Sequence, residues 1–250
     1  MLPSPGIDDL LRARCILCVQ PHYDDNDICA GGTLAALHAG GAELAYLTVT
    51  DDLVGVLDPG LPAAAAATQL KSEQLAAGEI IGVGQQIWLG YPDAGDFDHF
   101  ELRRQVARTI RRLRPDFVFT CDPWLPYEAH RDHLRTGAAV AEAAILYNLP
   151  RFSTDPEVDA SYQPYELAGI AFYMTHAPNL TYDISGYRHK KQAALNCYRA
   201  QFTPGEMESL QRTLEALERQ AGATAGCQFG EAFKLLSPRQ LHIDPHAWKS

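Results

Sequence analysis

The chain has 250 residues, of which 46% are hydrophobic, so it can bury a substantial core and is not a disordered protein. Its formal net charge of −10 excludes a phosphate-backbone partner in our interpretation, because nucleic-acid binding relies on clustered Lys and Arg. No apolar run approaches the ~20 residues needed to span a bilayer, and the N-terminus lacks the pattern of a secretory signal. The six scattered cysteines are typical of buried, reduced thiols. We therefore expect a cytoplasmic protein that binds neither nucleic acid nor membrane.

Along the first two thirds of the chain, short apolar runs alternate with segments of helical spacing. The runs typical of strands are at residues 15–19, 44–49, 86–89 and 117–120. The segments typical of helices are at residues 30–39, 63–81, 100–113 and 134–147. This alternation predicts an α/β fold with a Rossmann-like, mainly parallel sheet flanked by helices on both faces.

The last third of the chain has a different character. Two further strands are expected at 168–174 and 180–184, followed by helices at 187–200 and 204–220. Because no linker, repeat or low-complexity tract interrupts the chain, we expect a single domain over residues 1–250. Its α/β core would occupy about 15–150 and an elaborated C-terminal part about 151–250.

Two short polar motifs follow two of the predicted strands. His22, Asp24 and Asp25 come just after the first strand, and His130 begins the sequence His-Arg-Asp-His that follows the fourth. In open α/β sheets, sites form beyond the carboxyl ends of the strands. Both motifs should therefore lie on the same edge of the sheet.

The imidazole and carboxylate groups of these two motifs favour a metal site. Zn²⁺ takes N and O ligands, and a catalytic site keeps three protein ligands and an open position for water. A carboxylate left over beside that water is a candidate general base. Each residue also has a simpler explanation, since Asp24 and Asp25 can cap a helix and the two histidines can pair by helical spacing alone. The conjunction of the two motifs favours the metal, but it does not tell which aspartate is the ligand.

Further acidic residues follow predicted strands elsewhere. For these residues turn formation and capping are as good an explanation as chemistry. They are Asp51, Asp52, Asp93 and the segment 96–98.

These motifs carry a family resemblance. Pro-His-Tyr-Asp-Asp at 21–25, with Gly-Gly-Thr at 31–33, resembles the first signature of the PIG-L/LmbE-like zinc N-deacetylases, and the sequence at 130–133 resembles their second. The resemblance covers most of residues 15–205. The sequence His-Arg-Asp-His-x-Arg-Thr-Gly favours the branch of the family that resembles diacetylchitobiose deacetylase.

The resemblance implies a role for each motif residue. His22, Asp25 and His133 would bind zinc, and Asp24 would be the general base. His130 would stabilise the oxyanion and protonate the departing amine, while Asp132 would orient His130 and tune its charge.

The chain departs from the family pattern at positions around these residues. Tyr23 replaces the usual proline and Asn26 the usual glutamate. The substrate-binding arginine expected shortly before Glu73 is absent, and Leu70 and Lys71 stand there instead. The metal ligands and the base are retained, whereas the part that would contact substrate differs.

The resemblance implies a hydrolase that removes the acetyl group from an N-acetylated amino sugar of the N-acetylglucosamine type. The expected partner is this small molecule, and we expect the protein to be a homo-oligomer. Aromatic rings that can pack on a sugar face are Trp124, Tyr127 and Tyr91, with ordinary core packing as the alternative. Two other functions stay open: a zinc amidase or esterase acting on a non-sugar acyl substrate, and a non-catalytic metal-binding module.

Overall fold

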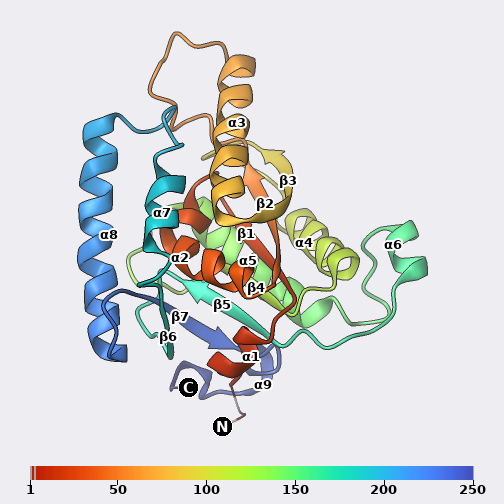
Figure 1. The fold of residues 1–250 in the computed structure, drawn as a ribbon. Helices are drawn as coiled ribbons and strands as arrows, with labels where there is room; N and C mark the ends of the chain where they lie inside the picture. The colour runs from red at the N-terminus through yellow and green to blue at the C-terminus, as the bar shows by residue number, and fades with distance from the viewer. Residues whose placement is uncertain (1, 3, 250) are drawn as a thin grey trace.

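The computed structural model describes residue 2 and residues 4–249, and it shows a twisted sheet wrapped by helices (Figure 1). Over this part of the chain the strands are β1 Cys15–Gln20, β2 Glu43–Thr50, β3 Val83–Tyr91, β4 Phe117–Cys121, β5 Gly169–Tyr173, β6 Leu180–Asp183 and β7 Gly230–Leu236. Their order across the sheet is β3-β2-β1-β4-β5-β7-β6. Strands β1 to β5 run parallel, and β7 is antiparallel to both of its neighbours. The predicted mainly parallel sheet is confirmed.

Helices cover both faces of the sheet, as predicted. In the described residues they are α1 Ile7–Leu11, α2 Asp25–Ala39, α3 Ala63–Ile81, α4 His99–Leu113, α5 Arg131–Leu146, α6 Pro156–Ser161, α7 Arg188–Leu195, α8 Pro204–Ala225 and α9 Gln240–Ile243. One hydrophobic core contains Leu34 of α2 and Leu70 of α3, and α7 and α8 pack on the same side. The other core contains Val106 of α4 and Val140 of α5. In Figure 1, α2 and α7 lie in front of the sheet and α5 lies behind it.

The strand order places the two motifs next to each other. Strands β1 and β4 are neighbours, yet the chain leaves β1 toward β2 on one side and leaves β4 toward β5 on the other. Such a switch in direction opens a crevice at the carboxyl ends of the two strands. The segments that follow β1 and β4 therefore lie next to each other at this edge of the sheet.

Four elements differ clearly from the sequence-based expectation. Strand β7 was not expected, and it lies between β5 and β6, so these two strands do not pair with each other. Helix α2 begins at Asp25, five residues before its predicted start, so the Gly-Gly-Thr sequence is inside the helix. There Gly32 packs directly against Ile184, where any side chain would collide with it. Helix α7 ends at Leu195 and α8 continues to Ala225.

The described residues include no helix that is both long and apolar enough to cross a membrane. All six cysteines are free thiols. Both findings agree with the composition, and neither identifies a compartment.

Candidate active site

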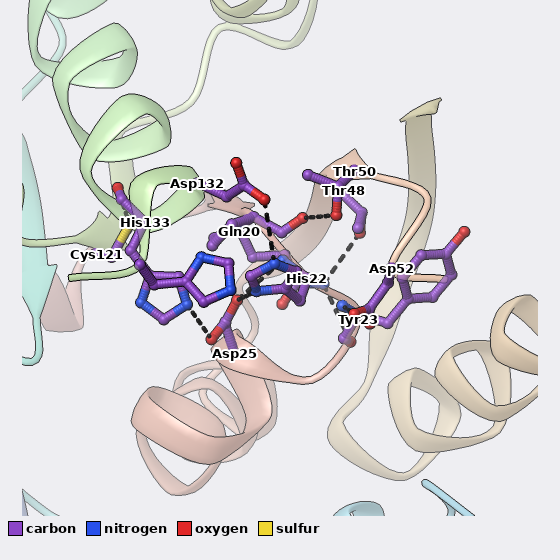
Figure 2. A network of polar contacts seen from close by, with 12 residues as sticks. Gln20, His22, Tyr23, Asp25, Thr48, Thr50, Asp52, Cys121, Asp132 and His133 are labelled. Carbon is purple, nitrogen blue, oxygen red and sulfur yellow. Dashed lines mark hydrogen bonds and ion pairs between the residues drawn. The ribbon is translucent and has the colours of Figure 1, made fainter. Parts of the chain in front are cut away.

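The three expected metal ligands meet around one carboxylate. His22 lies in the loop after β1, Asp25 opens α2, and His133 is in the first turn of α5. Asp25 Oδ2 is 3.3 Å from Nδ1 of His22, and Asp25 Oδ1 is 3.5 Å from Nε2 of His133. The three side chains are between 9% and 13% exposed, and Figure 2 shows them converging from the loop after β1, from α2 and from α5. Two segments more than a hundred residues apart thus form one pocket of ligands.

Close packing brings α5 to the end of β4, and His133 with it. A side chain at Gly137 would collide with the backbone carbonyl of Cys121, so the helix can approach the strand only with glycine there. In addition, Cys121 Sγ donates to the carbonyl of His133 at 3.0 Å. The position of His133 is thereby fixed relative to β4.

The donor set fits a divalent metal such as zinc. Two imidazoles and one carboxylate, with one ligand atom from each within 4.8 Å of the others, are a known catalytic combination for Zn²⁺. Burial alone would raise the pKa of Asp25, but the facing His133 and His22 lower it overall, so this carboxylate stays ionised. Burial lowers the pKa of His22, yet Asp25 and Asp93 raise it to about 11. Metal binding to this site would therefore release a proton.

The loop that carries His22 is held by buried side chains. Asp52 Oδ2 accepts from the Tyr23 N–H at 3.0 Å, and the Tyr23 carbonyl accepts from Gln20 Nε2 at 3.2 Å and from the Tyr198 hydroxyl at 2.9 Å. Gln20 Oε1 accepts from the N–H of Asn26 at 2.8 Å. Figure 2 shows Gln20 and Asp52 on either side of this loop. These hydrogen bonds hold the backbone of the loop that carries His22.

Asp24 occupies the N-cap position of α2 but makes no capping hydrogen bond. Its side chain is buried, and burial, together with the charges of Asp25 and Asp52, raises its pKa well above the usual value. Asp24 therefore does not act as a helix cap through its side chain, which was the simpler explanation for this residue. A carboxyl group with a raised pKa is a stronger base than an ordinary one, which suits proton abstraction.

His130 lies beside both ligand histidines. Its ring stacks on His133 with centroids 4.9 Å apart and meets His22 edge-on at 4.5 Å. Burial lowers the pKa of His130, as do the two neighbouring imidazoles, whereas Asp132 acts in the opposite direction. The closest ion-pair contact of Asp132 is with Nε2 of His22, at 3.6 Å, and its Oδ2 also accepts from the N–H of Ala94 at 2.8 Å. Tuning of His130 by Asp132 stays a prediction.

Two acidic residues join the site that the sequence analysis did not place there. Asp93, interpreted above as a turn or cap residue, has Oδ1 3.3 Å from Nε2 of His22, and its Oδ2 accepts from the N–H of Val54. Glu128 lies 3.4 Å from Nδ1 of His133. For Asp93, its position after a third strand of the same sheet edge was an available signal. For Glu128 the signal was only an acidic residue two positions before the second motif.

The candidate sugar-binding aromatics differ in exposure. Tyr127 is fully exposed and Trp124 is 57% exposed, both in the loop between β4 and α5. Tyr91 instead packs against Phe97, with ring centroids 4.8 Å apart. Trp124 also contacts an aromatic ring, that of Phe172, with centroids 5.6 Å apart, so of the three candidates Tyr127 has the most exposed ring.

The chain is similar in sequence and in structure to deacetylases. Residues 17–144 match the sequence profile of the family described as PIG-L: GlcNAc-PI de-N-acetylase. A diacetylchitobiose deacetylase of Thermococcus kodakarensis is 32% identical over 232 residues, which are 93% of this chain and 86% of that protein. The solved N,N'-diacetylchitobiose deacetylase from Pyrococcus horikoshii, in complex with its inhibitor MPG, superposes with a TM-score of 0.89 at 32% identity and covers 96% of this chain and 90% of that one.

A more distant structure limits what the fold alone can show. GalB, the 4-carboxy-2-hydroxymuconate hydratase from Pseudomonas putida, superposes with a TM-score of 0.73 at 20% identity, covering 90% of this chain and 95% of that one. The same architecture therefore occurs in a hydratase, and the reaction has to be argued from the site.

Fold and relatives together define an N-deacetylase, a hydrolase built on a Rossmann-like sheet, with a cluster of His and Asp side chains at the switch point that could hold a metal ion. The chain belongs to the PIG-L family. The family and the branch suggested by the sequence motifs are both confirmed.

Proposed function

We propose that this protein is a zinc-dependent deacetylase that hydrolyses the acetamido group of an N-acetylglucosamine-type sugar. The observation that carries the proposal is the Asp25 carboxylate lying between His22 and His133, with Asp24 left over beside it. The 32% identity to a diacetylchitobiose deacetylase supports the substrate class. A cytoplasmic location, a homo-oligomeric state and a single domain over residues 1–250 are further parts of this proposal.

His22, Asp25 and His133 would hold the metal. When bound, zinc supplies a Lewis acid for the acyl carbonyl and lowers the pKa of a coordinated water to about 7. Asp24 takes a proton from the attacking water, so that the water oxygen adds to the acetyl carbonyl carbon. The C–N bond then breaks, and the products are acetate and the free amino sugar.

His130 is suited to the second half of the reaction. It sits beside both ligand histidines, where negative charge develops on the acyl oxygen. Because its pKa is lowered, its protonated form is a stronger acid than a free imidazolium and gives its proton more readily to the departing amine. Asp132 opposes this lowering and keeps part of His130 protonated.

The substrate side of the site would be formed by residues particular to this chain. Of the two residues at the place of the missing arginine, Leu70 is fully buried and uncharged, and Lys71 lies over the Trp88 ring with its Nζ 5.4 Å from the ring centroid. Trp124 and Tyr127 present exposed rings on the loop that leads to His130. We infer that stacking on these rings takes a larger share of sugar recognition than charge does.

The test is a screen of the zinc-loaded full chain for acetate release. Substrates would include diacetylchitobiose, N-acetylglucosamine and a p-nitrophenyl N-acetylglucosaminide, beside non-sugar N-acetyl amides and acetyl esters. Acetate released only from the sugars supports the proposal. Release only from the other acyl compounds identifies a different substrate class, and tight zinc binding without hydrolysis of any compound identifies a non-catalytic metal-binding module.

A further inference from the structure

Glu128 contacts both histidines of the second motif. Its side chain is 14% exposed. Oε1 accepts from the backbone N–H of His130 at 2.7 Å, and Oε2 lies 3.4 Å from Nδ1 of His133. A single carboxylate therefore reaches the backbone of one histidine and the ring of the other.

The loop before Glu128 is organised to direct it inward. The N–H of Leu125 donates to the carbonyl of Asp122 at 3.3 Å, and the N–H of Glu128 donates to the carbonyl of Leu125 at 3.2 Å, so two successive turns precede α5. Tyr127 adopts a left-handed backbone conformation with φ of 68° although its side chain is fully exposed. Such a conformation costs a non-glycine residue of order 1–3 kcal/mol and clusters at functional sites. Packing of the exposed Tyr127 ring does not compensate this cost.

The ring of His133 lies between two carboxylates. Nε2 faces Asp25, the shared metal ligand, and Nδ1 faces Glu128 on the other side of the ring. Nδ1 is buried and makes no regular hydrogen bond among the described residues, so Glu128 is the carboxylate within its reach. If Nε2 ligates the metal, the ring proton has to sit on Nδ1.

The other expected ligand, His22, also lies between two carboxylates, with the roles of its two ring nitrogens exchanged. Nδ1 of His22 faces Asp25 at 3.3 Å, and its Nε2 faces Asp93, also at 3.3 Å. A carboxylate on the far nitrogen of a ligating imidazole fixes the tautomer and raises the basicity of the ligand. Both imidazoles of this site therefore have such a partner.

We propose that Glu128 is a positioning residue that orients His133, keeps its proton on Nδ1 and so strengthens its bond to the metal. This inference rests on the metal ligands of the proposed function. It assigns Glu128 to metal affinity and gives it no part in binding the sugar or moving protons in the reaction.

The experiment measures zinc affinity by chelator competition in the full chain and in Glu128→Ala and Glu128→Gln. We expect Glu128→Ala to weaken zinc binding ~10–100-fold, as loss of such a partner does in other metal sites. Glu128→Gln should weaken it less, because the amide oxygen still accepts from Nδ1–H but carries no charge. Asp96→Asn is the matched control, since this carboxylate is fully exposed in the loop after β3 and should leave the affinity unchanged.

Thermal unfolding of the metal-free proteins and the visible spectrum of the cobalt-substituted proteins complete the test. The midpoint for metal-free unfolding should stay close to the wild-type value in both variants, and the cobalt spectrum should keep its intensity. A large loss of midpoint in the metal-free Glu128→Gln protein would show a structural role and overturn the inference. A loss of affinity beyond about a thousandfold in both variants, with a changed cobalt spectrum, would make Glu128 a direct ligand and also overturn it.

The two proposals fail in different ways. If Glu128→Ala binds zinc as tightly as the wild type does, only the positioning role of Glu128 is contradicted. Absence of zinc binding by the wild type removes the proposed function itself.

Discussion

The two halves of the candidate metal site are built differently. The first half, the loop around Tyr23, is buried, and side chains from β1, from the segment after β2 and from the segment after α7 hold its backbone. The second half, the loop between β4 and α5, is held by its own turns and exposes Trp124 and Tyr127. The first half thus fixes the geometry of the metal ligands, and the second presents His130 and aromatic rings to whatever enters. His133 belongs to the second segment but points its Nε2 into the first.

The largest effect is expected in the buried half. Asp24→Asn removes the base and no ligand, so kcat should fall on the order of 10²–10⁴-fold while zinc content stays at the wild-type level. Steady-state kinetics and metal analysis of the same preparation check this. Loss of zinc in Asp24→Asn, with zinc retained in Asp25→Asn, would show that the roles of the two aspartates are reversed.

The second prediction separates the two histidines of the exposed half. His133→Ala should lose most of its zinc because one of three ligands is gone, whereas His130→Ala should keep it. Both proteins should be nearly inactive, for different reasons. Metal analysis of the two purified proteins decides the matter, and equal zinc loss in both would make His130 a ligand.

Substitutions in the two loops should also differ in their effect on the free energy of unfolding, and this effect is smaller than the two above. Gln20 is fully buried and bonds to Tyr23, Asn26 and Thr48, so Gln20→Ala should lower the free energy of unfolding by about 2–3 kcal/mol, because polar groups lose their partners. Tyr127→Ala should change it by less than about 0.5 kcal/mol, because the ring is fully exposed. Urea unfolding of the metal-free proteins measures both. Equal losses would mean that the second loop is as firmly held as the first.

The smallest effect concerns the pH dependence of the rate. The rate should rise as the water and Asp24 lose a proton and fall as His130 loses one, which gives a bell-shaped profile of kcat/KM. Asp132 raises the pKa of His130, so Asp132→Asn should let His130 lose its proton at lower pH and move the alkaline limb in that direction. Zinc content should change little. An alkaline limb that stays in place would leave Asp132 with its observed contacts to Ala94 and His22 only.

Local sequence patterns predicted most of the fold, because the strands β1 to β5 are apolar and their helices have clear spacing. Strand β7 was missed, because it contains Glu231 and Lys234, both buried. Glu231 is stabilised there by Lys191, at 2.7 Å, and by the N–H groups of Gly32 and Thr33. These partners are far away in the sequence, so no local pattern could reveal why a charged strand is buried.

The same reason explains the part of the site that motifs did not predict. His22, Asp25 and His133 stand in recognisable motifs, and the structure brings them together. The contribution of Asp93 and Glu128 depends on which ring nitrogen each one faces, and this is a property of the folded chain. For the same reason the sequence analysis began this helix at residue 30, although Asp25, Asn26 and Asp27 are buried in the first turn of α2.

The position of β7 between β5 and β6 has a consequence for the order of folding. All the expected metal ligands precede residue 134, whereas the outer neighbours of β4 come from residues 169–236. A nascent chain that ends at α5 would contain all three expected ligands. The edge of β4 that faces β5 would still be unpaired, although all five residues of β4 are buried in the folded protein. An open apolar edge of this kind invites pairing with other chains. Pairing with β5, which comes from the last third of the chain, closes this edge in the folded protein.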